Sequence, residues 1–136
     1  MKRANFIGAP HFFDLNQACR VVAEAFGHSL YLVGSSLERR DYRDVDVRCI
    51  LDDAEFDGLF PGLVGHGYAY NARWSIVCSS ISLWLSQHSN LPVDFQIQRM
   101  TEANAEYAGP RSALGFFVGP PEERAPSQDS APKEEP

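Results

Sequence analysis

Three aspartates, each next to at least one apolar residue, are the side chains of this sequence best suited to chemistry. Asp44 and Asp46 stand two residues apart, and Asp94 follows about fifty residues later. Residues i and i+2 of a strand share a face, so Asp44 and Asp46 would point the same way with Cα atoms roughly 6.5–7 Å apart. Three carboxylates brought together would repel one another without a cation, and oxygen-only ligands favour Mg²⁺ or Mn²⁺ over zinc. If Asp94 lies on the same sheet face, we expect a divalent-metal site.

A turn of small residues, Gly34-Ser35-Ser36, follows directly on the apolar run 30–33. Glycine allows a phosphate to approach the backbone closely, and hydroxyls and amides at a helix start can donate to phosphate oxygens. Ser35 and Ser36 could equally serve as a helix cap. Beside the aspartates, the turn is a candidate site for a polyphosphate. In the loop before the acidic strand, Arg39, Arg40 and Arg43 are candidates for countering phosphate charge, although some could simply be solvated.

These residues must be positioned by a small set of helices and strands. Apolar residues recur at helical spacing in two long segments, and they run continuously or alternate with polar residues in three short ones. Such an order predicts a mixed α/β (α+β) domain with a small mixed β-sheet covered by helices on one side. The expected elements are helices over 14–26 and 72–88, strands over 30–33, 43–51 and 91–98, a short helix from 52 or 53 to 60, and a short helix followed by a loop or edge strand within 101–118.

Composition limits the organisation of the chain and its partners. The 136 residues suffice for one domain, which we place at 1–118, followed by a disordered Pro/Glu-rich tail at 119–136. The net charge of −6 excludes a basic surface for non-specific nucleic-acid binding. Three cysteines without a CxxC motif predict buried free thiols in a reducing cytoplasm. We expect neither a membrane span nor a secretory signal.

The three motifs together resemble the DNA polymerase β-type nucleotidyltransferase superfamily, and most closely its minimal members. The similar segments are Leu32-Val33-Gly34-Ser35, Asp44-Val45-Asp46-Val47 and Val93-Asp94-Phe95, which span about residues 30–97. The first two motifs together are fairly specific, whereas one aspartate on a strand is common. The spacer of eight residues between Ser35 and Asp44 is short on glycine, and no helical domain follows to hold the base or the acceptor.

The resemblance implies an activity and a role for each motif. Asp44 and Asp46 would bind two Mg²⁺ ions, and Asp94 would complete the ion that activates the attacking hydroxyl. Gly34 and Ser35, together with Ser36, would hold the β- and γ-phosphates of a nucleoside triphosphate (NTP). The reaction would transfer a nucleoside monophosphate to a protein side chain, an RNA end or a small molecule, and release pyrophosphate.

Other interpretations of the same residues stay open. The aspartates could form a solvated sheet face, and we expect Arg48, which shares that face, to pair with Asp46. Tyr68, Tyr70 and Trp74 could stack on a base, although loop packing explains them as well. The fold could also serve as a non-catalytic nucleotide- or partner-binding module, such as a toxin–antitoxin component, or as a metal-dependent phosphohydrolase with water as acceptor.

Overall fold

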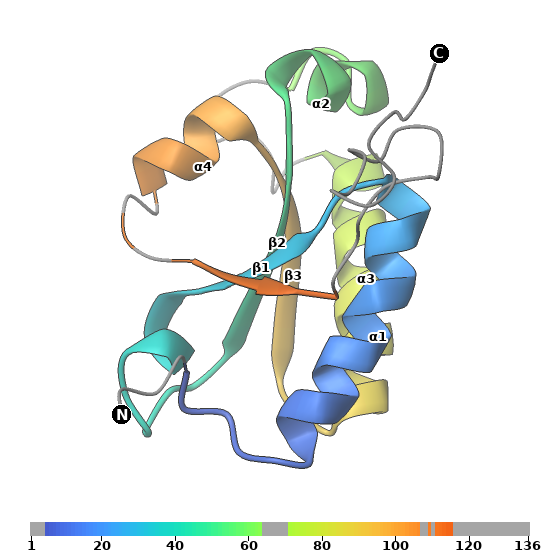
Figure 1. Cartoon of the computed structure of the whole chain (residues 1–136). Coiled ribbons are helices and arrows are strands. Elements are labelled where there is room, and N and C mark those ends of the chain that lie inside the picture. The colour runs from blue at the N-terminus through green and yellow to red at the C-terminus, as the bar shows by residue number, and fades with distance from the viewer. Residues whose placement is uncertain (1–4, 64–70, 107–108, 110, 116–136) are drawn as a thin grey trace, which may run out of the picture.

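A computed structural model describes residues 5–63, 71–106, 109 and 111–115 of the chain. Helices and strands alternate along it (Figure 1). The elements in chain order are α1 (His11–Phe26), β1 (Leu30–Val33), the 3-10 helix η1 (Gly34–Leu37), β2 (Val45–Leu51), α2 (Asp53–Leu59), α3 (Ala72–Ser89), β3 (Val93–Arg99), α4 (Met100–Glu106) and β4 (Ser112–Leu114).

The strands form one mixed sheet in the order β3-β2-β1-β4. β2 and β3 run parallel, whereas β1 is antiparallel to both of its neighbours, β2 and β4. Parallel neighbours need a long crossover connection, and the segment that contains α2 and α3 makes this crossover. The predicted fold class, a mixed α/β domain with a small mixed sheet, is confirmed.

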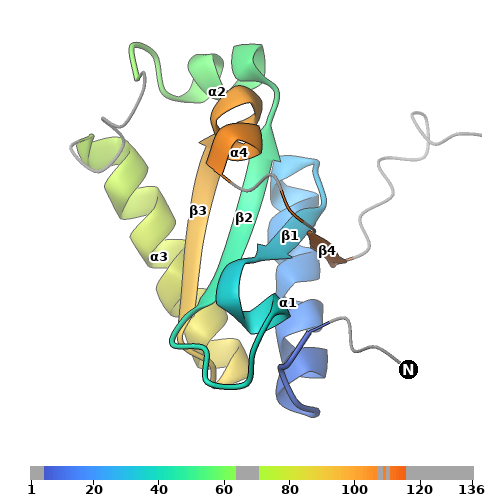
Figure 2. The same ribbon diagram turned by 90° about the vertical axis from the view of Figure 1, so that its left-hand side faces the viewer.

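Two long helices, α1 and α3, cover one face of the sheet (Figures 1 and 2). The start of α1 meets the end of α3, where the His11 Nδ1 atom lies 3.1 Å from the Ser89 carbonyl oxygen. Alternate residues of β2 and β3 point into the apolar core under these helices, and the intervening polar residues point to the opposite face. On that opposite face, α4 packs at the carboxyl ends of β2 and β3. The core residues contributed by these two strands are Val45, Val47, Cys49, Leu51, Val93, Phe95 and Ile97.

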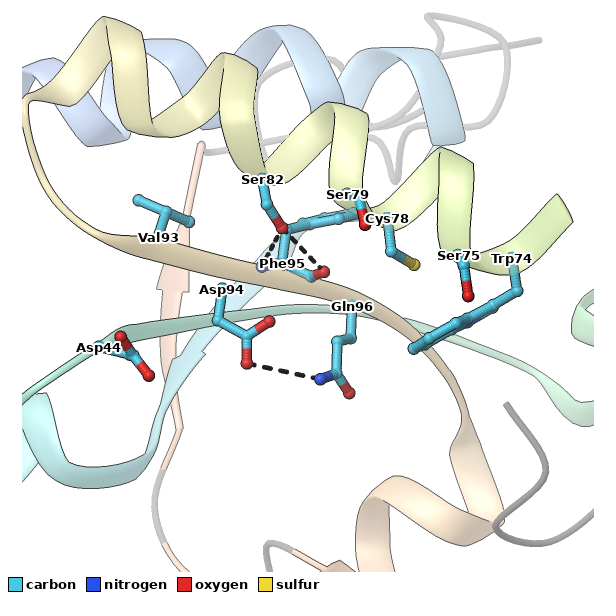
Figure 3. Close-up of a pocket in the computed structure, with 10 residues that line it drawn as sticks. All are labelled: Asp44, Trp74, Ser75, Cys78, Ser79, Ser82, Val93, Asp94, Phe95 and Gln96. Atoms are coloured by element: carbon cyan, nitrogen blue, oxygen red, sulfur yellow. Dashed lines mark hydrogen bonds between the residues drawn. The ribbon is translucent and has the colours of Figure 1, made fainter. Parts of the chain in front are cut away.

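Side chains of α3 cover the outer edge of β3. The Ser82 hydroxyl accepts from the Phe95 amide at 2.8 Å and donates to the Phe95 carbonyl at 3.2 Å (Figure 3). Ser86 does the same for Val93, at 2.9 and 3.4 Å. The four residues from Ser82 to Ser86 rise about 6 Å along the helix axis. This is close to the distance that two residues span along a strand. Helix and strand therefore stay in step, and the helix satisfies the backbone groups that an edge strand leaves unpaired.

The predicted element bounds agree with the structure to within a few residues. β2 begins at Val45, two residues later than predicted, so Asp44 ends the preceding loop instead of lying on the strand. The predicted tail at 119–136 lies outside the described residues. None of the described helices is long and apolar enough to cross a membrane.

The three cysteines are free and buried, as predicted. Burial raises the pKa of Cys19 and Cys49 to about 12 and that of Cys78 to about 11. Because the thiolate is the reactive form, none of these thiols is suited to nucleophilic chemistry.

Candidate functional site

Asp46 and Asp94 are partners on neighbouring strands. The parallel register of β2 and β3 places these two residues opposite each other, and neighbouring strands lie about 4.8 Å apart. Both side chains point away from the apolar core and are partly exposed. The sequence left open whether the Asp94 strand pairs with the Asp46 strand, and the structure shows that it does.

The guanidinium group of Arg48 lies close to both carboxylates. Its Nη2 atom is 3.8 Å from the Asp46 Oδ1 atom and 3.6 Å from the Asp94 Oδ2 atom. Its Nη1 atom donates to the backbone carbonyls of Asp94, at 2.8 Å, and Val47, at 3.1 Å. The Arg48 side chain is only 3% exposed, so these bonds hold it in place. The predicted pair with Asp46 is confirmed, whereas the pair with Asp94 was not predicted.

The Gly34 turn packs against Asp46. Val33 is the register partner of Asp46 on β1, so the next residue, Gly34, begins η1 beside the Asp46 side chain. The φ angle of Gly34 is +82°, and a β-carbon added there would overlap the Asp46 Oδ2 atom. Both the backbone conformation and the close approach require glycine. The structure thus brings the predicted phosphate turn to the predicted metal ligand.

The two serines of the turn differ in their access to a ligand. Ser35 is partly exposed, whereas Ser36 is fully buried. The Ser36 Oγ atom has no hydrogen-bond partner within the described part of the chain, and the Ser36 carbonyl accepts from the Phe6 amide at 2.8 Å. Of the two predicted phosphate ligands, only Ser35 presents its side chain to solvent in this conformation.

Asp44 stands at the mouth of the site. It is exposed, and β2 begins at the next residue, whose amide donates to the Pro92 carbonyl at 2.9 Å. That bond ties the segment containing Asp44 to the one that leads into Asp94. Asp44 and Asp94 both line a pocket at the edge of the sheet (Figure 3).

Burial and the neighbouring carboxylates disfavour the ionisation of Asp46. Partial burial raises the pKa of Asp46, Arg48 lowers it in part, and the charges of Asp94, Asp44 and Glu106 raise it further. The balance is a pKa above the ordinary value of 3.8. A bound cation would relieve this unfavourable charge.

The donor set is chemically suited to a hard cation, although it does not form a complete cage. Among the described residues, no three His, Cys, Asp or Glu side chains are gathered closely enough to hold a metal ion. Mg²⁺ is commonly held by one or two carboxylates together with substrate phosphates and water. Asp46 and Asp94, with Asp44 nearby, fit that pattern, in which the phosphates supply the remaining ligands.

The pocket beside Asp94 is a groove of about 390 Å³ between α3 and the edge of β3. Figure 3 shows Asp94 and Gln96 projecting from β3 on the side away from α3, while Ser79 and Trp74 come from the helix. Gln96 Nε2 donates to Asp94 Oδ2 at 3.4 Å. Gln96 was missed at the sequence level, although its position two residues after Asp94 places it on the same strand face.

Other predicted ligand-binding side chains have different roles or lie elsewhere. Trp74 is buried and donates from its indole nitrogen to the Ile97 carbonyl at 2.9 Å, which makes it a wall of the pocket. Arg39 pairs with Asp41 at 3.5 Å, and Arg40 and Arg43 are exposed in the same loop. Tyr68 and Tyr70 lie outside the described residues.

The chain matches no family model, no curated protein and no solved structure. The similarity to DNA polymerase β-type nucleotidyltransferases therefore stays a prediction from the motif residues.

Proposed function

We propose that this protein is a nucleotidyltransferase dependent on Mg²⁺ or Mn²⁺, which transfers a nucleoside monophosphate from an NTP to a hydroxyl group. The observation that carries the proposal is the meeting of three distant segments. Asp46 and Asp94 are register partners, and Gly34 is packed against the Asp46 carboxylate. A solvated sheet face would not need a glycine with φ of +82° at that point.

Each part of the site has a distinct task in this proposal. Asp44, Asp46 and Asp94 would hold the cations, which when bound neutralise phosphate charge at the attacking and leaving oxygens. The Gly34-Ser35 turn would hold the outer phosphates, because a residue without a side chain leaves the backbone open to them. Asp94 and Asp44 line the pocket, so their carboxylates would lie beside an acceptor hydroxyl bound there.

A second candidate is a binding module of the same fold without catalytic activity, such as a toxin–antitoxin component. Arg48 favours it, because the guanidinium group already pairs with Asp46 and Asp94 at 3.8 and 3.6 Å. In that case the guanidinium group of Arg48 takes the place of a metal ion, and the only role of the carboxylates is to stabilise this face of the sheet.

A labelled NTP separates the two functions. Purified protein is incubated with α-labelled NTPs and either Mg²⁺ or Mn²⁺, and released pyrophosphate and labelled products are measured. Asp46→Asn and Asp94→Asn should abolish metal-dependent pyrophosphate release. Asp52→Asn is the matched control, because Asp52 is exposed and its side chain does not cap α2. The transferase would be ruled out if the wild type released no pyrophosphate. It would also be ruled out if Asp46→Asn and Asp94→Asn released pyrophosphate as fast as Asp52→Asn.

A further inference from the structure

The pocket beside Asp94 has a distinctive charge distribution. Its two ionisable carboxylates, Asp44 and Asp94, belong to the proposed metal site. Neutral hydrogen-bonding side chains such as Ser79 and Gln96 form much of the remaining wall, and Trp74 adds an apolar surface. Within the described part of the chain, no lysine or arginine lines the pocket.

This charge distribution is unsuited to an anionic acceptor. Proteins hold RNA and phosphate esters mainly through lysine and arginine, together with backbone amides. Once cations neutralise Asp44 and Asp94, the pocket offers no further positive side chain to a phosphate group. It offers hydroxyl and amide groups instead, which both donate and accept and so match the hydroxyls of an uncharged ligand.

The pocket is also unsuited to an extended peptide. A peptide that added to the edge of β3 would need the outward backbone groups of that strand. Ser82 and Ser86 already bond those groups at Phe95 and Val93. The volume of about 390 Å³ lies instead within the range of small-molecule sites.

Ser79 is a further polar group on the wall. It is exposed on α3 and lines the groove. A ligand in the groove could therefore contact Ser79 from one side and the Asp94–Gln96 pair from the other. These contacts would direct one ligand hydroxyl towards Asp94.

We propose that this groove is the acceptor subsite and takes an uncharged, hydroxyl-rich small molecule of the sugar or polyol class. The inference rests on the proposed nucleotidyl transfer. In the reaction the acceptor oxygen forms a bond to the α-phosphorus, and the bond from that phosphorus to the pyrophosphate oxygen breaks. The hydroxyl proton is released to solvent.

The test compares acceptors that differ in charge. α-Labelled NTP and Mg²⁺ are supplied with glucose, glucose 6-phosphate, glycerol, glycerol 3-phosphate or an RNA oligonucleotide, and label on each compound is measured. We expect each neutral compound to be labelled at least about tenfold faster than its phosphate ester, because an unpaired charge in the groove opposes binding. RNA should remain unlabelled.

Two substitutions at one position test the location of the subsite. Ser79→Trp should fill the groove and lower labelling of glucose by at least about tenfold. Ser80→Trp is the control, because Ser80 is exposed on the same helix but does not line the groove. Ser79→Lys should shift the preference towards glucose 6-phosphate.

The outcomes separate this inference from the proposed function. Preferential labelling of RNA or of the phosphate esters, or equal labelling by the Ser79→Trp and Ser80→Trp variants, would overturn the subsite. NTP hydrolysis by water without labelling of any neutral compound would also overturn it, yet would leave metal-dependent chemistry at the aspartates intact. If the wild type releases no pyrophosphate with water or any acceptor, the proposed function itself fails.

Discussion

Gly34 lies so close to the carboxylate of Asp46 that a β-carbon at position 34 would overlap the Asp46 Oδ2 atom. These residues belong to different segments, which the antiparallel pairing of β1 with β2 brings together. The contact makes the turn and the carboxylate one unit. Any side chain at position 34 must displace the carboxylate from its place beside Asp94.

Gly34→Ala should therefore weaken Mn²⁺ binding and pyrophosphate release as well as stability. Gly27→Ala is a matched control, because Gly27 has a φ of +76° but open space around its added β-carbon. Both variants should lose about 1–2 kcal/mol of unfolding free energy from the positive φ alone. Urea unfolding measures that loss, and Mn²⁺ titration should show weaker binding for Gly34→Ala only. Equal Mn²⁺ affinity in the two variants would contradict a role for the contact.

Arg48→Met should destabilise the protein in the absence of divalent cations. The substitution leaves Asp46 and Asp94 without their shared partner, at an expected cost of about 1–3 kcal/mol. If the carboxylates bind a cation, millimolar Mn²⁺ should raise the melting temperature of the variant more than that of the wild type. No rise in the variant would indicate that the carboxylates bind no cation and stabilise the sheet only.

The Asp53–Thr101 contact should make stability depend on pH. The Thr101 hydroxyl and amide both donate to the Asp53 carboxylate and thereby join α2 to α4. These two bonds, the side-chain one first, lower the pKa of Asp53 below the ordinary value of 3.8.

Because the folded-state pKa is depressed, the stabilising contribution is present above pH 3.8 and is lost as the pH falls through the folded-state pKa. Asp53→Asn should be less stable than the wild type in urea at pH 6. The difference should shrink progressively below pH 3.8. A constant difference across that range would show that ionisation of Asp53 does not matter.

Ser82→Ala should expose the edge of β3. Its loss leaves the Phe95 amide and carbonyl without their partner, which should cost about 1–3 kcal/mol of unfolding free energy. Open strand edges pair with other chains, so we also expect concentration-dependent self-association by analytical ultracentrifugation. Ser80→Ala, an exposed substitution on the same helix, should change neither property. A monomeric Ser82→Ala variant of wild-type stability would show that the serine does not protect the edge.

The sheet face on which Asp46 and Asp94 lie could be predicted from the sequence, whereas their neighbours could not. Alternation along β2 separates Asp46 from Val45 and Val47, since side chains of a strand point to opposite faces. Alternation carries no information on which strand lies beside another. The parallel register that joins Asp94 to Asp46, and hence to Arg48, depends on packing of the whole sheet.

Local sequence patterns also fail to predict the neighbours of residues in the Gly34 turn and in α3. The motif Gly34-Ser35-Ser36 predicts a close backbone approach, but not that Ser36 is buried while Ser35 is partly exposed. The apolar spacing of α3 predicts a helix, yet Ser82 looks like an ordinary solvent-facing residue until β3 packs beside it. Such pairings depend on distances across the chain that local patterns do not contain.

A crystal structure with Mn²⁺ and a non-hydrolysable NTP tests the central claim most directly. We expect an anomalous peak bounded by the carboxylates of Asp46 and Asp94, with the triphosphate along the Gly34-Ser35 turn. Absence of that peak at saturating Mn²⁺ and nucleotide, with Arg48 still paired to both carboxylates, would contradict a metal-dependent transferase.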